Sequence, residues 1–188
     1  IESGLVNVVS PAGAKGIWQF MPDTAKEIGL EVNENIDERY HLEKATEAAC
    51  VYFLKAKEKF GNWTLVAAAY NAGGTGVKKQ MDTQRVTNYY DLLLNDETSR
   101  YVFRILALKQ IMEHPEQYGF PIAEEEQYRI VATKKIVIDS SVTDLASLAI
   151  QQGINYKILK IHNPWLRTTK MLNPTNKKYQ LEIPLEGY

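Results

Sequence analysis

The sequence predicts a mainly α-helical domain over residues 1–123, followed by a small α+β module of βααβ order over residues 124–188. Apolar residues recur every three or four positions in 42–60 and in 99–113, which is the period of an amphipathic helix. After residue 123 the pattern changes to short runs rich in β-branched residues. The 188 residues, 45% of them hydrophobic, suffice for one packed domain with a small appendage.

The first helices are predicted from their start and stop signals. Pro22 suits a first helical turn, and Thr24 with Glu27 fits a capping box. The amphipathic helix over residues 42–60 should end at Gly61.

Two more helices are expected further along the chain. Residues 63–70 are almost wholly apolar, so we expect a buried helix that is closed by the Asn-Ala-Gly-Gly turn at 71–74. The helix over residues 99–113 should be capped by Asp96 or Thr98.

The C-terminal module should start after the charged linker Glu124–Glu126. Its expected elements, in chain order, are strand at 128–131 and 135–138, a helix stopped by Gly153, a helix capped by Asn155 and ending at Asn163, and a closing strand at 178–183.

Composition excludes some classes of function. The chain has 22 basic and 23 acidic residues, so charge gives no case for nucleic-acid binding. No run approaches the roughly 18 apolar residues of a membrane span. Cys50 is the single cysteine, lies in an apolar helical run and is expected to be a small buried hydrophobe.

The strongest chemical signal is a carboxylate, Glu2, ahead of a glycine-rich turn that contains Gly13 and Gly16. The two glycines allow a tight turn and the close approach of a ligand. Cleaving a glycosidic bond requires an acid at the leaving oxygen. A groove that grips a sugar polymer, with Glu2 as its acid, is therefore the favoured interpretation, although Glu2 taken alone reads as an ordinary exposed glutamate.

Other residues offer the groups that hold a sugar. Ser10 and Gln19 could bind an N-acetyl group or a hydroxyl, or could be a cap and a satisfied polar residue. Met21 could pack on a sugar face or in a core. Tyr70 and Asn71 end a buried helix, where a role beside the acid is plausible.

No metal or other cofactor is expected. The three histidines have no mutual ligand spacing, no Gly-x-Ser-x-Gly elbow occurs, and Cys50 lies in an apolar run. Because an acid at residue 2 needs earlier chain packed around it, Ile1 is interpreted as the start of a fragment or of a processed chain.

Four ordered motifs resemble the soluble-lytic-transglycosylase catalytic domain, a goose-type-lysozyme-like family, over roughly residues 1–115. They are Glu2-Ser3-Gly4, Ser10 through Ala25, Ala69-Tyr70-Asn71-Ala72-Gly73 and Glu97-Thr98-Ser99-Arg100-Tyr101-Val102. The tail resembles a LysM peptidoglycan-binding module, but it reads Asp139-Ser140-Ser141-Val142-Thr143 where such modules usually have Gly-Asp-Thr.

The resemblance implies a lysozyme-like, mainly helical catalytic domain that is N-terminally short in this chain. It implies that Glu2 acts first as acid and then as base, giving 1,6-anhydro-MurNAc ends without a second catalytic carboxylate. It implies groove or acid-positioning roles for Ser10, Gln19, Met21, Tyr70, Asn71 and Tyr101, and structural motif positions for Gly13, Gly16 and Glu97.

The partner implied by the resemblance is the glycan strand of peptidoglycan. We expect a monomer in the bacterial periplasm or cell envelope, with any membrane anchor, such as that of an outer-membrane lipoprotein, in a missing N-terminal segment. Two alternatives stay open: a lysozyme- or chitinase-type hydrolase on the same groove, and a noncatalytic peptidoglycan-binding protein.

Overall fold

A computed structural model describes residues 1–186 of the chain, which fall into two units. We call the unit made of Ile1 and Ala49–Gln127 the helical unit. We call the unit made of Glu2–Ala48 and the chain from Tyr128 onward the α/β unit. The first part of the chain is thus grouped with the C-terminal part, and each unit is described by itself.

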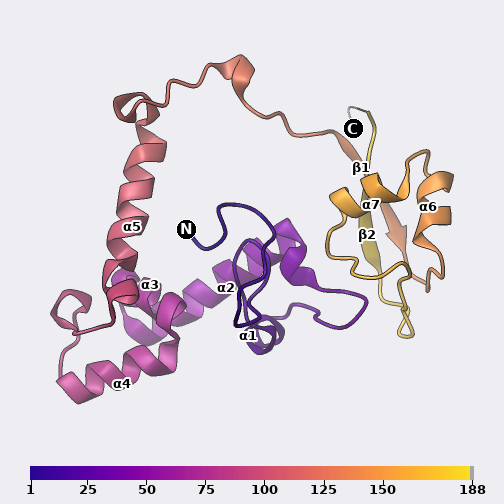
Figure 1. Ribbon diagram of the computed structural model, residues 1–188. Helices are drawn as coiled ribbons and strands as arrows, with labels where there is room; N and C mark the ends of the chain where they lie inside the picture. The colour runs from indigo at the N-terminus through magenta and orange to yellow at the C-terminus, as the bar shows by residue number, and fades with distance from the viewer. Residues whose placement is uncertain (187–188) are drawn as a thin grey trace. The chain divides into compact units, whose positions relative to one another are not determined.

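The described residues form seven α-helices and a two-stranded sheet, so the predicted mainly helical fold with a small α+β part is confirmed. The elements, labelled in Figure 1, are α1 (Pro22–Glu27), α2 (Leu42–Phe60), α3 (Trp63–Ala72), α4 (Gly74–Gln84), α5 (Asp96–Glu113), β1 (Thr133–Ile138), α6 (Leu145–Gln151), α7 (Tyr156–His162) and β2 (Tyr179–Pro184).

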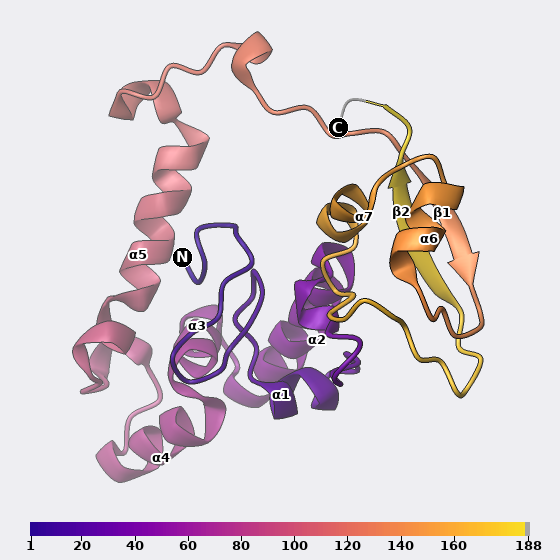
Figure 2. The same cartoon turned by 45° about the vertical axis from the view of Figure 1, so that its right-hand side comes forward.

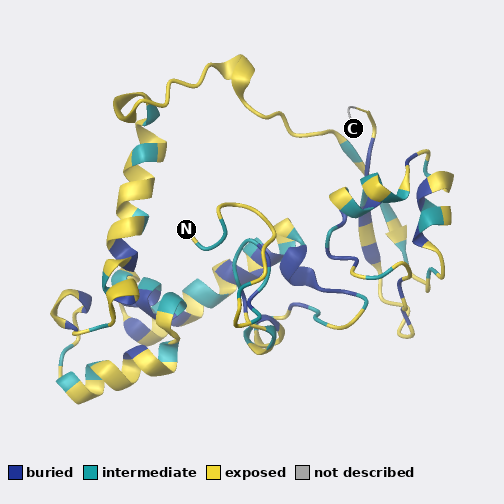
Figure 3. Ribbon diagram, viewed as in Figure 1, coloured by how far each residue is buried: buried dark blue, intermediate teal, exposed yellow. Residues whose placement is uncertain are grey.

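The core of the helical unit is built around α3. Its buried residues Leu65, Val66 and Ala69 pack with Val77 of α4 and Val102 of α5. Beyond its first turns α5 is largely exposed, as Figure 3 shows. The apolar sequence of α3 therefore serves, as predicted, as the buried centre of this unit.

The core of the α/β unit lies between the β1–β2 ladder and the two short helices (Figure 2). The strands pair antiparallel from Thr133 opposite Pro184 to Ile138 opposite Tyr179. Alternate residues of β2 point into the core, as the period of a strand requires. This confirms the predicted βααβ order.

Several local predictions were wrong. The N-cap of α1 is Met21 and makes no side-chain capping bond, so Thr24 and Glu27 form no capping box. The cap of α5 is Asn95, whose Oδ1 accepts from the Thr98 N–H at 2.9 Å. Neither Asp96 nor Thr98 is the cap, because the helix begins three residues earlier than its apolar period suggested.

Other errors concern exposure. Residues 128–131 form no strand, and Tyr128 and Ile130 are fully exposed, so β-branched composition alone did not create a strand there. Cys50, within α2, is exposed rather than buried. Helix α4 was not predicted, because residues 71–74 were expected to form a closing turn. In the structure Gly73 (φ +83°) alone separates α3 from α4, which begins at the next residue.

Candidate active site

Residues 8–20 form a compact loop in the α/β unit, closed by its own backbone. The Gly16 N–H donates to the Val8 carbonyl at 3.1 Å, and the Lys15 N–H donates to the Phe20 carbonyl at 3.2 Å. The Ser10 Oγ accepts from the Ala14 N–H at 3.0 Å. The loop is therefore an ordered structure, and the Ser10 side chain contributes to it.

Gln19 lies in this loop with a backbone that few non-glycine residues adopt. Its φ is +51°, and its side-chain Nε2 donates to the carbonyls of Gly16 at 2.7 Å and Val8 at 3.2 Å. These two bonds offset the conformational cost of the left-handed region, about 1–3 kcal/mol. The side-chain carbonyl oxygen of Gln19 is the group that could accept a hydrogen bond from a sugar.

A buried ion pair lies beneath the loop and was missed by the sequence analysis. The Arg39 guanidinium donates to both carboxylate oxygens of Asp37, at 2.8 Å through Nε and 2.7 Å through Nη2. Its Nη1 also donates to the carbonyls of Phe20 at 3.0 Å and Gly13 at 3.3 Å. Arg39 and Asp37 are each 3% exposed.

Removing either partner of such a pair destabilises the fold by about 3–5 kcal/mol, because it leaves one buried charge without a counter-charge. The available sequence signal was Asp37-x-Arg39 between the apolar residues Ile36 and Tyr40, which are themselves buried. Arg39 therefore fixes the two carbonyls of Gly13 and Phe20, one within the glycine-rich turn and one at its end.

Glu2 is half-buried in the α/β unit and precedes a tight turn. Gly4 and Leu5 both have positive φ, +63° and +64°, and the Val6 N–H reaches the Ser3 carbonyl at 3.4 Å. Glu2 thus lies directly before a turn and outside any helix or strand. Met21, at the start of α1, is 43% exposed and is not a core residue.

The remaining predicted site residues belong to the helical unit. Asn71, in the last turn of α3, accepts from the Thr98 Oγ1 at 2.8 Å and donates to the Glu97 Oε1 at 3.2 Å. Tyr70 is half-buried, with its ring centroid 5.0 Å from that of Phe53. The structure therefore brings together Asn71 of the third motif and Glu97 of the fourth.

Tyr101 is buried, 5% exposed, in the second turn of α5. Glu2, Ser10, Gln19 and Met21 lie in one unit, and Tyr70, Asn71, Glu97 and Tyr101 lie in the other. A single groove that contains both groups stays a prediction.

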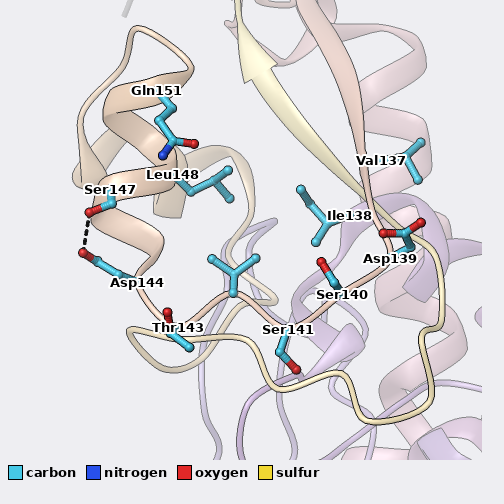
Figure 4. A pocket seen from close by; sticks show the side chains of 11 residues that line it. Val137, Ile138, Asp139, Ser140, Ser141, Thr143, Asp144, Ser147, Leu148 and Gln151 are labelled. Carbon is cyan, nitrogen blue, oxygen red and sulfur yellow. Dashed lines mark hydrogen bonds between the residues drawn. The ribbon is translucent and has the colours of Figure 1, made fainter.

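The C-terminal part of the α/β unit has a hollow of about 530 Å³ between the end of β1 and α6 (Figure 4). Ser141, Val142 and Thr143 are among its lining residues, and there the LysM-like pattern departs from Gly-Asp-Thr. Asp144 caps α6 and accepts from the Ser147 Oγ at 2.5 Å, and these bonds lower the pKa of the Asp144 carboxyl. The Asp144 carboxylate is thus already engaged within the module.

Residues 1–186 contain neither a cluster of metal-ligating residues nor a membrane-spanning helix. No group of three or more His, Cys, Asp and Glu residues is arranged to hold a metal ion in this part of the chain. None of the helices within these same residues is long and apolar enough to cross a membrane.

Comparison with known families and proteins gives concordant results. Residues 1–93 match the transglycosylase SLT domain, and residues 134–187 match the soluble lytic transglycosylase C-terminal LysM-like domain. The chain is 33% identical, over 162 residues, to membrane-bound lytic murein transglycosylase D of Escherichia coli strain K12 and to the protein of the same name in E. coli O6:H1. The matched region covers 84% of this chain, and the chain spans about 35% of the length of these relatives.

Proposed function

Residues 1–93 belong to the transglycosylase SLT family and residues 134–187 to the soluble lytic transglycosylase C-terminal LysM-like family, and on that premise we propose that this protein is a peptidoglycan lytic transglycosylase. It cleaves the β-1,4 bond between N-acetylmuramic acid and N-acetylglucosamine without adding water. The single observation that carries the proposal is the SLT match itself, because it spans Glu2, the glycine-rich loop and Asn71.

In the proposed mechanism one carboxyl group acts twice. The Glu2 carboxyl first gives its proton to the glycosidic oxygen, so that N-acetylglucosamine leaves as an alcohol. The Glu2 carboxylate then takes the proton of the muramic C6 hydroxyl, whose oxygen attacks C1 and closes the 1,6-anhydro ring. The N-acetyl group of the substrate can stabilise C1 between the two steps, which removes the need for a second carboxylate.

The loop and the helix ends are assigned to substrate binding. The ordered backbone of residues 8–20 supports this, since a preorganised loop binds a ligand with less loss of entropy than a mobile one. Ser10 and Gln19 would contact the glycan from this loop, Met21 from the start of α1, and Tyr70 and Asn71 from the end of α3. We place Glu97 in a supporting role, because it accepts the hydrogen bond of the Asn71 amide.

We propose that the protein acts as a monomer on glycan strands in the bacterial cell envelope, without a metal ion. The names of the two E. coli relatives, membrane-bound murein transglycosylases, support this location.

Mass spectrometry of digested peptidoglycan tests the proposal. Purified sacculi are incubated with this chain and with a form extended before Ile1, and the released muropeptides are analysed. Ends of 1,6-anhydromuramic acid are expected. Reducing ends would make the protein a hydrolase instead, and glycan binding without cleavage by either form would make it a peptidoglycan-binding protein.

A further inference from the structure

One segment of the α/β unit, residues 31–41, contacts both the predicted substrate-binding loop and the C-terminal module. We call this segment the brace. It begins with a small hairpin over residues 31–38, since the Glu38 N–H donates to the Glu31 carbonyl at 2.9 Å and the Asn33 N–H donates to the Ile36 carbonyl at 2.7 Å, and it continues with a short 3-10 helix at Glu38–Tyr40. All of the contacts argued below lie within this one unit.

On the module side, the brace completes the hydrophobic core. Ile36 is fully buried and Tyr40 nearly so, in a cluster with Leu159, Leu166 and other apolar residues of the module. The backbones of the brace and the module also pair, since Ile36 lies opposite Leu166 in an isolated antiparallel bridge. The module core is therefore incomplete without the brace.

Further contacts hold the brace to the module. The Asp37 N–H donates to the Trp165 carbonyl at 2.9 Å, and the Arg167 N–H donates to the Asn35 carbonyl at 2.8 Å. The Arg167 guanidinium lies over the Tyr40 ring at 4.0 Å from its centroid. A cation and a ring at this distance attract each other, which adds to the area buried.

At the end of the brace, Glu31 joins the module through its carboxylate. Lys177 lies 2.7 Å from its Oε2, and the Tyr179 hydroxyl donates to both oxygens at 3.0 and 3.1 Å. Burial and the nearby Glu31 carboxylate raise the pKa of Tyr179, which keeps that hydroxyl a donor. The Glu31 carboxylate therefore joins the brace to the module through one charged donor, Lys177, and one neutral donor, Tyr179.

On the loop side, the same segment supplies the ion pair beneath residues 8–20. Arg39 holds the carbonyls of Gly13 and Phe20, and the Arg39 carbonyl packs against Gly16. Asp37 fixes the guanidinium, while its own backbone N–H is bonded to Trp165 of the module. Arg39 of the brace thus contacts the loop, while Asp37, two residues earlier, is bonded to the module.

We propose that Asp37 and Arg39 are positioning residues for the glycine-rich loop, and that the C-terminal module sets this loop in place through the brace. This rests on the proposed function only in so far as the loop binds glycan. The module is then an integral support of the site, whether or not it binds glycan itself.

Hydrogen exchange of the full chain tests the support, independently of activity. The double variant Arg167→Ala/Tyr179→Phe removes two module-side contacts and leaves every residue of the loop and brace intact. The amides of Lys15 and Gly16 are expected to exchange about tenfold faster, with the Leu159 amide of α7 much less affected. The control Ser147→Ala, which loses a surface bond elsewhere in the module, should leave the loop amides unchanged.

Unchanged loop amides in the double variant would overturn the proposal, and so would equal acceleration of the loop and α7 amides, which reports general unfolding.

A second variant, Arg39→Lys, keeps the charge but lacks the planar fork. On soluble peptidoglycan oligomers its KM is expected to rise about 10- to 100-fold with a smaller change in kcat, because the loop carries binding groups. Wild-type kinetics in Arg39→Lys would contradict the positioning role. Absence of anhydro products from the wild type would instead contradict the proposed function. The exchange experiment would still show whether the module holds the loop in place.

Discussion

The carbonyl oxygen of Arg39 lies directly against Gly16, so that a Cβ atom placed on Gly16 would be only 1.9 Å from it. Gly16 also has a φ of +79°, in the left-handed region that side chains disfavour. This one contact explains why the loop carries a glycine here, and it joins the loop to the brace.

The first prediction concerns this contact. Gly16→Ala should lower the free energy of unfolding by about 2–4 kcal/mol, because backbone strain and overpacking add. Gly13→Ala is the matched control, since Gly13 also has a positive φ but a Cβ there would have open space. Its cost should be about 1 kcal/mol, from strain alone. Urea denaturation measures both, and equal losses would show that the Arg39 contact has no energetic weight.

The second prediction concerns the hydrogen bonds that Asn71 makes to α5. Thr98 is 1% exposed, so Thr98→Val leaves the Asn71 Oδ1 without its donor and should cost about 1–2 kcal/mol. Asn71→Ala should cost a similar amount, and the double variant less than the sum, with a coupling of at least about 0.5 kcal/mol. Denaturation of the four proteins gives the coupling. Strict additivity would rule out an energetic link between Asn71 and Thr98.

The third prediction concerns pH. Burial raises the pKa of Glu31, but the hydrogen bonds from Lys177 and Tyr179 outweigh this, so its pKa in the folded protein lies below the ordinary value. A lowered pKa means that the carboxylate stabilises the fold above the ordinary glutamate pKa of about 4.3, and that this stability is lost as the pH falls through the lower folded value.

Glu31→Gln should therefore be less stable than the wild type at pH 7, and the difference should shrink as the pH falls below about 4. Glu34→Gln is the control, because Glu34 is an exposed residue of the same hairpin. Thermal unfolding at a series of pH values measures the difference. A gap that stays constant down to pH 3 would contradict the role of the ionised carboxylate.

The fourth prediction concerns the proposed acid. Glu2→Gln should abolish the formation of anhydro ends, since an amide can neither give nor take the proton, while binding to insoluble peptidoglycan stays near that of the wild type. Glu27→Gln removes the same charge from an exposed position at the end of α1 and should keep full turnover. Turnover near the wild-type rate in Glu2→Gln would exclude Glu2 as the acid.

Much of the secondary structure was readable from the sequence, because local chemistry decides it. The bounds of α2 follow from its apolar period and from Gly61, and Asn155 caps α7 through a bond of its Oδ1 to the Ile158 N–H. Where local signals competed, the prediction failed. Asn95 rather than Asp96 caps α5, and residues 128–131 pair with no other strand despite their strand-like composition.

The sequence by itself determined the motifs and most of the helices and strands, since these depend on neighbouring residues and on spacing. Only the tertiary structure decided that Asp37 and Arg39 are buried beneath the loop, and that residues 31–41 complete the core of the C-terminal module. Both facts depend on contacts between residues far apart in the chain, such as Arg39 with Phe20 and Asp37 with Trp165. The free energy of such contacts comes from burial and from hydrogen bonds made away from water, and no local pattern in the sequence records which distant residue will supply the partner.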